Sequence, residues 1–543
     1  MNTIINKRFV FVFLAALMSC MTVLSACSDN GIGYTFKANI EFNPENLDPQ
    51  LACDKSSLII IGNMFEGLMK LNEDGSVVNG AAESYNVSED GMTYTFKLKD
   101  NIYWEGVGDF KAKLSADDFV YAFKRIYDSS TNSPYRDTFK CIKNASAIEN
   151  GLKDVDSLGV RADDALTLTI ELDYPYYNFI YLLTSTAAMP CNEEFFISTK
   201  GRYGLAPEAT ISNGAFYLKE WNYDPYWNNN YIIMRRNKSN SEYDSIYPSG
   251  LNFFITGDST KDISDFSDGN IDCMSTDIYN KKLFNSANVK LYKTKSAGLF
   301  LNPKSEIFGS SSLRYALAAS FDREKCKEVL PDGFDIAYGI IPNGITILNK
   351  SVRDIVPEAD YSLYDVNTAQ RNWTNELSKL DVVSLDGVKI MVSENFAGSD
   401  ALHCVTEQWQ NNLNFFCSIE VVSAKEYQSR IESGDFDIIL SEFDNIENDP
   451  AKCFDYFVSD NEKNILGYSN SAVDSKASKI LKSLSLNESV SAINAAELEI
   501  INDSYYIPLF YESKYFLTNK NAQGIEYNPY TGQIYFKESK MFD

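Results

Sequence analysis

The sequence predicts an α/β protein built from more than one lobe, and three observations lead to this fold class. The chain has 543 residues, whereas a single hydrophobic core stops growing at about 250–300 residues. Apolar side chains alternate with polar ones over residues 92–99, which is the period of a half-buried strand. Residues 116–127 instead carry apolar side chains at helical spacing. Strands and helices therefore mix along one chain.

The N-terminal segment predicts export. Met1 to Arg8 is short and basic, Phe9 to Leu24 is almost unbroken apolar, and Leu24-Ser25-Ala26-Cys27 follows. This order is typical of a signal peptide covering residues 1–26. Its end resembles a bacterial lipobox, which would make Cys27 the lipidated first residue of the mature chain. An uncleaved membrane anchor is the alternative, because the apolar run is nearly long enough to span a bilayer.

The first elements of the mature chain have local signals. Residues 34–49 predict a strand and a turn. Asp90-Gly91 predicts a hairpin turn that leads into the strand over 92–98. Ser115 has an acid three residues later, which indicates a capping box at the start of a helix ending near Tyr127. A second strand is expected over 166–172.

The second half of the chain repeats this alternation. Residues 313–318 predict a helix. Residues 388–392, 401–413 and 419–421 predict a strand, a helix and a strand in turn. The four segments are typical of an α/β body.

Composition and missing motifs narrow the function. The 75 acidic and 49 basic residues give a net charge of −26, which argues against binding nucleic acid phosphates or anionic lipid. His403 is the single histidine, and no His-Glu-x-x-His, Gly-x-Ser-x-Gly or Gly-x4-Gly-Lys motif occurs. We therefore expect no enzymatic activity, no metal and no cofactor. The ten scattered cysteines do not form a zinc pattern, and those beyond Cys27 are expected to be free buried thiols.

Five short motifs, taken in order, resemble one family. They are Leu47-Asp48-Pro49, Phe65-Glu66-Gly67-Leu68, Tyr94 to Leu98, Asp118 to Arg125, and Ser133-Pro134-Tyr135. This array resembles the extracellular solute-binding proteins of ABC importers of the oligopeptide/dipeptide type (solute-binding protein family 5). The resemblance covers nearly all of the mature chain.

The resemblance implies a periplasmic-binding-protein-like fold of class II (cluster C), with two main lobes, an extra lobe and a hinged interdomain cleft. It places base lobe I at 28–58, 200–296 and 512–543, extra lobe II at 59–199, and lobe III at 297–511. It also implies that Leu299 to Asn302 begins a strand that crosses into lobe III. Ligands favour clefts of this kind.

The resemblance further implies that a peptide is held between the lobes through its backbone. An acid in a Trp-x-x-Asp-Tyr-x-x-Pro segment would bind its α-ammonium group. A gapless count puts Phe443 at the Trp and Ile446 at the Asp, so the acid is missing from its expected position. An unpaired buried ammonium costs several kcal/mol.

Three explanations of this mismatch remain open. Asp444 takes the role of the acid after a loop shift, the ligand lacks a free amino terminus or is not a peptide, or the gapless count is wrong. Tyr135, Phe300, Asn395 and Phe443 are the other residues expected at the cleft. For the aromatic residues among them, packing in the core is the alternative.

The resemblance thus predicts a substrate-binding lipoprotein on the outer face of the cell membrane. It would capture oligopeptides by hinge closure and deliver them to ABC permease subunits, as a monomer anchored through Cys27. One alternative is a receptor for another solute, such as an oligosaccharide or a peptide-like signal. The other is a surface interaction or sensing lipoprotein that has lost transport.

Overall fold

The computed structural model describes residues 33–542, apart from 73–74, 227–228, 259, 348–349, 359–362, 395, 397–400, 445–447 and 484. The predicted signal peptide and Cys27 therefore lie outside the described residues. Within the described part, no helix combines the length and apolar character needed to cross a membrane.

A single sheet of eleven strands runs through the molecule. It is mixed: β1 pairs in parallel with β12 and β13, and β18 pairs in parallel with β19 and β20, whereas the remaining pairs are antiparallel. In order across the sheet, the strands are β10 (Phe216–Asn222), β11 (Tyr231–Arg236), β12 (Gly250–Ile255), β1 (Thr35–Ile40), β13 (Cys273–Thr276), β21 (Tyr506–Asn519), β14 (Ala287–Leu301), β20 (Ile438–Asp444), β18 (Lys389–Ser393) and β19 (Ser418–Val422), with β15 (Phe334–Ile336) on β21.

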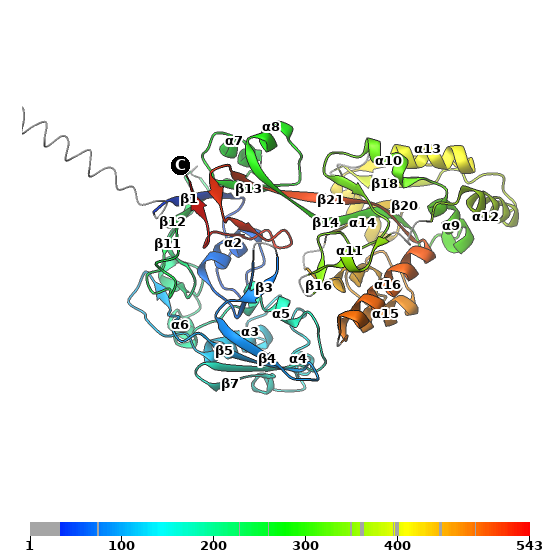
Figure 1. Cartoon of the computed structure of the whole chain (residues 1–543). Coiled ribbons are helices and arrows are strands. Elements are labelled where there is room, and N and C mark those ends of the chain that lie inside the picture. Colours follow the sequence, from blue (N-terminus) through cyan, green and yellow to red (C-terminus); the bar gives the residue numbers. More distant parts are fainter. Residues whose placement is uncertain are drawn as a thin grey trace, which may run out of the picture.

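Two long strands carry this sheet from one body to the other. β14 has 15 residues and β21 has 14, and they pair with each other along almost their whole length. One half of the pair lies beside β13 and the other half between β15 and β20. Figure 1 shows β14 and β21 passing from the body on the left to the body on the right. We call these two strands the crossing strands.

The prediction that Leu299 to Asn302 begins the crossing was wrong. β14 starts at Ala287 and ends at Leu301, so this segment is the end of the strand. Residues 287–293 are half-buried or exposed, and lysines at 290, 293 and 295 interrupt the apolar pattern that would have indicated the strand.

The base lobe is the body that contains β1 and β10–β13. Its helices are α2 (Lys55–Met64), α7 (Thr260–Ser267) and α8 (Lys281–Asn285), and four short C-terminal strands pack on it: β22 (Ala522–Gln523), β23 (Glu526–Tyr527), β24 (Ile534–Tyr535) and β25 (Lys540–Met541). Asn63 of α2 donates to the Ile534 carbonyl oxygen at 2.7 Å. This bond fixes the C-terminal segment to α2.

A second lobe is built on a separate four-stranded sheet, β4-β5-β8-β7, covered by α3 (Ala116–Tyr127). The strands are β4 (Ala82–Val87), β5 (Thr93–Leu98), β8 (Thr167–Glu171) and β7 (Val160–Asp164), so both strands predicted here are confirmed. Ser115 and Asp118 form the predicted capping box. Smaller elements complete this lobe and its junction with the base: β2 (Met69–Leu71), β3 (Val77–Asn79), β6 (Glu105–Gly106), β9 (Ile211–Ser212), α4 (Ala145–Glu149), α5 (Phe179–Leu182) and α6 (Glu193–Ser198).

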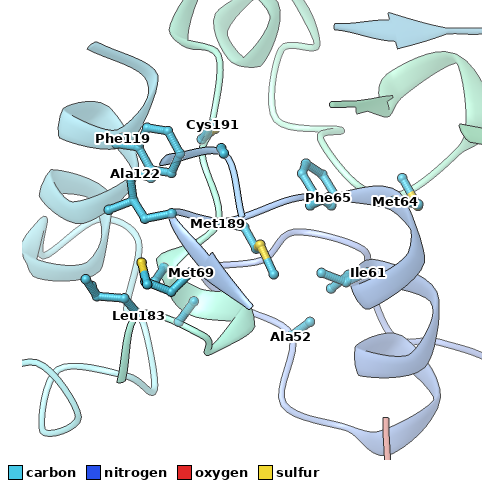
Figure 2. Packing of buried hydrophobic residues seen from close by; sticks show 14 of the residues in the cluster. Ala52, Ile61, Met64, Phe65, Met69, Phe119, Ala122, Leu183, Met189 and Cys191 are labelled. Atoms are coloured by element: carbon cyan, nitrogen blue, oxygen red, sulfur yellow. The ribbon is translucent and has the colours of Figure 1, made fainter. Parts of the chain in front are cut away.

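One apolar cluster joins the second lobe to the base lobe. Figure 2 shows Met64 and Phe65, at the end of α2, in one apolar cluster with Met189, Met69 and Phe119. Beside it, the guanidinium of Arg125 on α3 forms a buried ion pair with Asp48. Both residues belong to the motifs singled out in the sequence, and the pair ties the start of the mature chain to α3.

The third lobe packs helices on both faces of its part of the sheet. On one face lie α9 (Ser311–Ala319), α12 (Val366–Lys379) and α13 (Leu402–Leu413), and on the other lie α14 (Ala424–Ser433), α15 (Ser471–Leu481) and α16 (Leu486–Asp503). Short elements fill its rim: α10 (Arg323–Cys326), α11 (Val352–Ile355), β16 (Thr346–Ile347) and β17 (Lys350–Ser351). The strand, helix and strand predicted over 388–421 correspond to β18, α13 and β19.

The expectation of free thiols needs one correction. Cys326 at the end of α10 and Cys404 on α13 form a disulfide, with their Cα atoms 5.6 Å apart. The two residues are 78 positions apart in sequence, so the spacing gave no sign of the pair. Cys141, Cys191, Cys273 and Cys453 are free and buried as expected, whereas Cys53 is free but exposed and Cys417 is free but only half-buried, contrary to the expectation of burial.

Candidate ligand-binding site

The site is centred on the edge of the third lobe where parallel strands end. β18 ends at Ser393 and β20 ends at Asp444, and the two strands are paired in parallel. Ligands in open α/β sheets bind outside such carboxyl ends. The crossing strand β14 passes this edge, because Lys295 is the register partner of Asp444.

A cavity of about 230 Å³ lies at this edge. Ser393 and the stretch Leu440 to Phe443 form one side, and α14 contributes Tyr427, Gln428 and Ile431. Phe396, Tyr456, Ile465 and Leu466 complete a mostly apolar wall. The Tyr427 hydroxyl donates to the Leu440 carbonyl oxygen at 2.7 Å, which fixes α14 against β20.

Phe443 is the predicted site residue that lies on this cavity. Its ring packs 4.5 Å from Tyr456 and 5.1 Å from Tyr506, measured between ring centroids, and only 2% of the residue is exposed. Phe443 therefore supports the cavity wall and also belongs to the core. The alignment of Phe443 with the Trp of the family motif still rests on the gapless count.

Two other predicted residues lie in core packing. Phe300 on β14 is fully buried in the core cluster on the α14–α16 face of the third lobe. Tyr135 is half-buried against the base cluster, and its hydroxyl donates to the carbonyl oxygen of Ala52. Burial raises the pKa of Tyr135 to about 12. Neither residue lines the cavity beside Phe443.

Three predicted positions, Asn395, Asp444 and Ile446, lie wholly or partly outside the described part of the chain. Asn395 and Ile446 lie outside the described residues, each two positions beyond the end of β18 or β20. The backbone of Asp444 closes β20, and its side chain is outside the described part. The three explanations of the missing acid therefore stay untested at these residues.

Charged side chains cluster where the crossing strands pass the cavity. Glu512 on β21 is the register partner of Lys295 on β14, and Glu442 on β20 is the partner of Ala297, two positions further along β14. Because strand residues alternate between faces, Glu442, Lys295 and Glu512 lie on the same face. Lys295 Nζ reaches Asp277 at 3.3 Å.

A second cavity, of about 690 Å³, lies between the lobes. It is lined by Tyr181 of the second lobe, Tyr292 of β14, Gly344 and Asn448 of the third lobe, and the base segment 526–530. The Tyr530 hydroxyl donates to the Gly344 carbonyl oxygen at 2.5 Å across this space. Hydroxyl and amide groups thus gather where three lobes meet.

A polar bridge connects the second and third lobes near this cavity. Asp449 is fully buried and accepts hydrogen bonds from the hydroxyls of Tyr176 and Tyr177, the latter at 2.7 Å. Asn178 donates to the Asn448 carbonyl oxygen at 3.2 Å. The segment that follows β20 is therefore held by the second lobe.

Sequence reasoning missed Glu442, Lys295 and Glu512. The one signal was a carboxylate inside otherwise apolar strand segments, as in Leu509-Phe510-Tyr511-Glu512. Their proximity depends on the register of three strands that are far apart in sequence. Among the described residues, no group of three or more His, Cys, Asp or Glu side chains could hold a metal ion.

Two bodies that share a sheet through two crossing strands, with cavities beside the crossing, define a lobed solute-binding fold. The chain belongs to the bacterial extracellular solute-binding proteins, family 5, whose middle-region model matches residues 76–464. Members of this family are binding proteins.

Similarity to peptide-binding proteins extends over nearly the full length of the chain. The chain is 26% identical to the dipeptide-binding protein of Lactococcus lactis subsp. cremoris, over 94% of this chain and 95% of that protein. It is 24% identical to the oligopeptide-binding protein OppA of Bacillus subtilis, over 98% and 99%. The unliganded open form of the periplasmic murein tripeptide-binding protein MppA superposes with a TM-score of 0.72 at 23% identity, over 94% and 98%.

Proposed function

We propose that the chain captures oligopeptides between its base and third lobes and delivers them to the permease of an ABC importer. The observation that carries this proposal is the cavity at the carboxyl ends of β18 and β20, beside the only two strands of the sheet that pass between these lobes in the described part of the chain. Rotation about these strands would close the base lobe over a ligand while each lobe stays rigid.

Peptide capture agrees with the chemistry of the site. The cavity walls are mostly apolar and aromatic, which suits side chains of varied identity, and Ser393, Gln428, Ser441 and Glu442 add polar groups to the lining. Backbone hydrogen bonds contribute about 0.5–1.5 kcal/mol each, so several of them would supply affinity with little dependence on sequence. In this proposal the chain binds and delivers peptides and catalyses no reaction.

The division into lobes and the membrane anchor belong to the same proposal. We place base lobe I at 28–58, 200–296 and 512–543, extra lobe II at 59–199 and lobe III at 297–511, so that α2, which packs against β10 and β24 of the base, spans the boundary between lobes I and II. Cys27 would carry lipid and hold a monomer on the outer face of the cell membrane. The disulfide between Cys326 and Cys404 supports an oxidising, extracytoplasmic location. Palmitate labelling tests the anchor: label should enter the wild type and be absent from Cys27→Ala.

A thermal-shift screen of residues 28–543 tests the ligand class. A ligand at about 100 times its dissociation constant adds roughly 2.7 kcal/mol to the free energy of unfolding. Stabilisation by random tetrapeptide and pentapeptide pools is the expected result. Stabilisation by oligosaccharides alone would support a receptor for another solute, and no stabilisation by any class would support a sensing lipoprotein instead.

A further inference from the structure

The second and third lobes are tied together at a point away from the cavity of about 230 Å³. The hydroxyls of Tyr176 and Tyr177 donate to the buried carboxylate of Asp449, and Asn178 donates to the Asn448 carbonyl oxygen at 3.2 Å. None of these five residues lines that cavity. We call them the lobe joint.

Apolar packing supports the same contact. The ring of Tyr177 packs against the core cluster shared by the base and second lobes and also against the cluster on the α14–α16 face of the third lobe. Leu481, the last residue of α15, packs against the same two clusters. Because parting the lobes here would expose apolar surface to water, these two side chains oppose separation at the joint.

The joint is also fixed to a crossing strand. Asn448 Oδ1 accepts the backbone N–H of Thr346 at 2.7 Å, and Asn448 Nδ2 donates to the Thr346 hydroxyl oxygen at 2.6 Å. Two residues before Thr346, the Gly344 N–H donates to the carbonyl oxygen of Lys293 on β14 at 2.8 Å. A Cβ atom at Gly344 would clash with that oxygen, so the close approach to β14 depends on glycine.

The base lobe meets the third lobe at the same place. The Tyr530 hydroxyl donates to the Gly344 carbonyl oxygen, and its ring packs against the third-lobe cluster. Figure 1 shows β16 of the third lobe and α5 of the second lobe close together below the crossing strands. Three lobes therefore converge beside the strands about which the third lobe would rotate. Rotation moves atoms least at such a place, because displacement grows with distance from the axis.

We propose that the lobe joint is the pivot of closure, held by the second lobe, and that the third lobe turns about it to cover the ligand. This inference rests on the proposed function, and it assigns a mechanical role to the second lobe. The joint stays formed in the open and in the closed molecule, whereas the cavity of about 230 Å³ changes its shape. The alternative is a latch that forms only when the lobes close.

Hydrogen–deuterium exchange of residues 28–543, with and without a saturating random pentapeptide pool, distinguishes a pivot from a latch. The backbone N–H groups of Thr346 and Ala451 report on the joint, because both donate to its side chains. For a pivot, exchange in the segments containing these amides should slow no more than exchange in α3, while residues 427–431 beside the cavity should slow at least about fivefold. Greater slowing at the joint than in α3 would show that the joint forms on closure, and would overturn the inference.

Tyr177→Phe tests the joint by removing one hydroxyl donor while keeping the ring. A freed third lobe samples orientations in which the site is incomplete, so calorimetric titration should show about threefold to tenfold weaker binding of the pentapeptide pool. The radius of gyration of the ligand-free variant should rise in small-angle X-ray scattering. Tyr226→Phe, at an exposed position, should behave as wild type. Asn178→Ala should change affinity in the same direction as Tyr177→Phe, and it keeps the test valid if Tyr177→Phe is unstable.

A purely structural role gives a different result. Folded Tyr177→Phe protein with a lower melting temperature, but with the affinity and radius of gyration of wild type, would overturn the inference and leave peptide capture standing. Failure of wild type to bind any peptide would instead overturn the proposed function. In that case a larger radius of gyration in ligand-free Tyr177→Phe would still support the joint as the pivot, and an unchanged one would overturn it.

Discussion

At the scale of single residues, the third lobe depends on a buried ion cluster. Arg353 Nη2 lies 2.6 Å from Glu497 Oε1, and its Nε lies 3.0 Å from Glu358 Oε1. Glu497 is fully buried and also accepts the backbone N–H of Ile341 at 3.1 Å. The cluster holds the segment around Ile341, which leads into Gly344, against α16.

Arg353→Leu should lower the free energy of unfolding by about 3–5 kcal/mol, because it leaves Glu497 buried without its partner. Urea unfolding measures this. Arg371→Leu, which removes an exposed guanidinium from α12, should change it by no more than about 0.5 kcal/mol. Similar midpoints for the two variants would show that the buried pair contributes nothing.

Glu512 makes stability depend on pH. Its folded pKa of about 8 lies above the ordinary value of 4.5, so between these pH values the folded state binds more protons than the unfolded state. Stability from this group therefore falls as pH rises through that window. Glutamine does not titrate, so Glu512→Gln should not lose stability through this group as the pH rises. The melting temperature of the variant should therefore exceed that of wild type by more at pH 8 than at pH 5. An equal difference at both pH values would contradict the raised pKa.

At the scale of elements, the disulfide joins α10 to α13 on one face of the third lobe. Closing a loop of 78 residues restricts the unfolded chain. Replacing both Cys326 and Cys404 by Ser should cost about 2–5 kcal/mol in urea unfolding, whereas Cys53→Ser, at an exposed free thiol, should cost little. Equal stability in both variants would mean that the two cysteines are not bonded.

Elements with strong local signals could be predicted from sequence. The capping box at Ser115 and the alternation over 92–98 correspond to α3 and β5, because caps and amphipathic periods act within a few residues. β14 could not be predicted over its full length, because its first half is charged and is held by pairing with β21. The same limit applies to the site: Phe443 came from a motif, whereas Glu442 and Glu512 meet through the register of distant strands.

At the scale of the whole molecule, the Asp449 bridge joins the second and third lobes beside the crossing strands. Replacing Tyr176 and Tyr177 by Phe removes both hydroxyl donors and leaves a buried carboxylate with unmet acceptors. The double variant should lose about 1–3 kcal/mol for each bond, measured by urea unfolding. Tyr226→Phe, at a position that is 93% exposed, is the control. An unchanged free energy of unfolding in the double variant would mean that the two hydrogen bonds to Asp449 do not stabilise the contact between the lobes.

The central claim is that a ligand is enclosed by rotation about β14 and β21. Small-angle X-ray scattering of residues 28–543, with and without a saturating random pentapeptide pool, measures this most directly. Closure should lower the radius of gyration when the peptides bind. A radius of gyration that stays the same at proven saturation would contradict the claim, since the ligand would then be held without movement of the lobes.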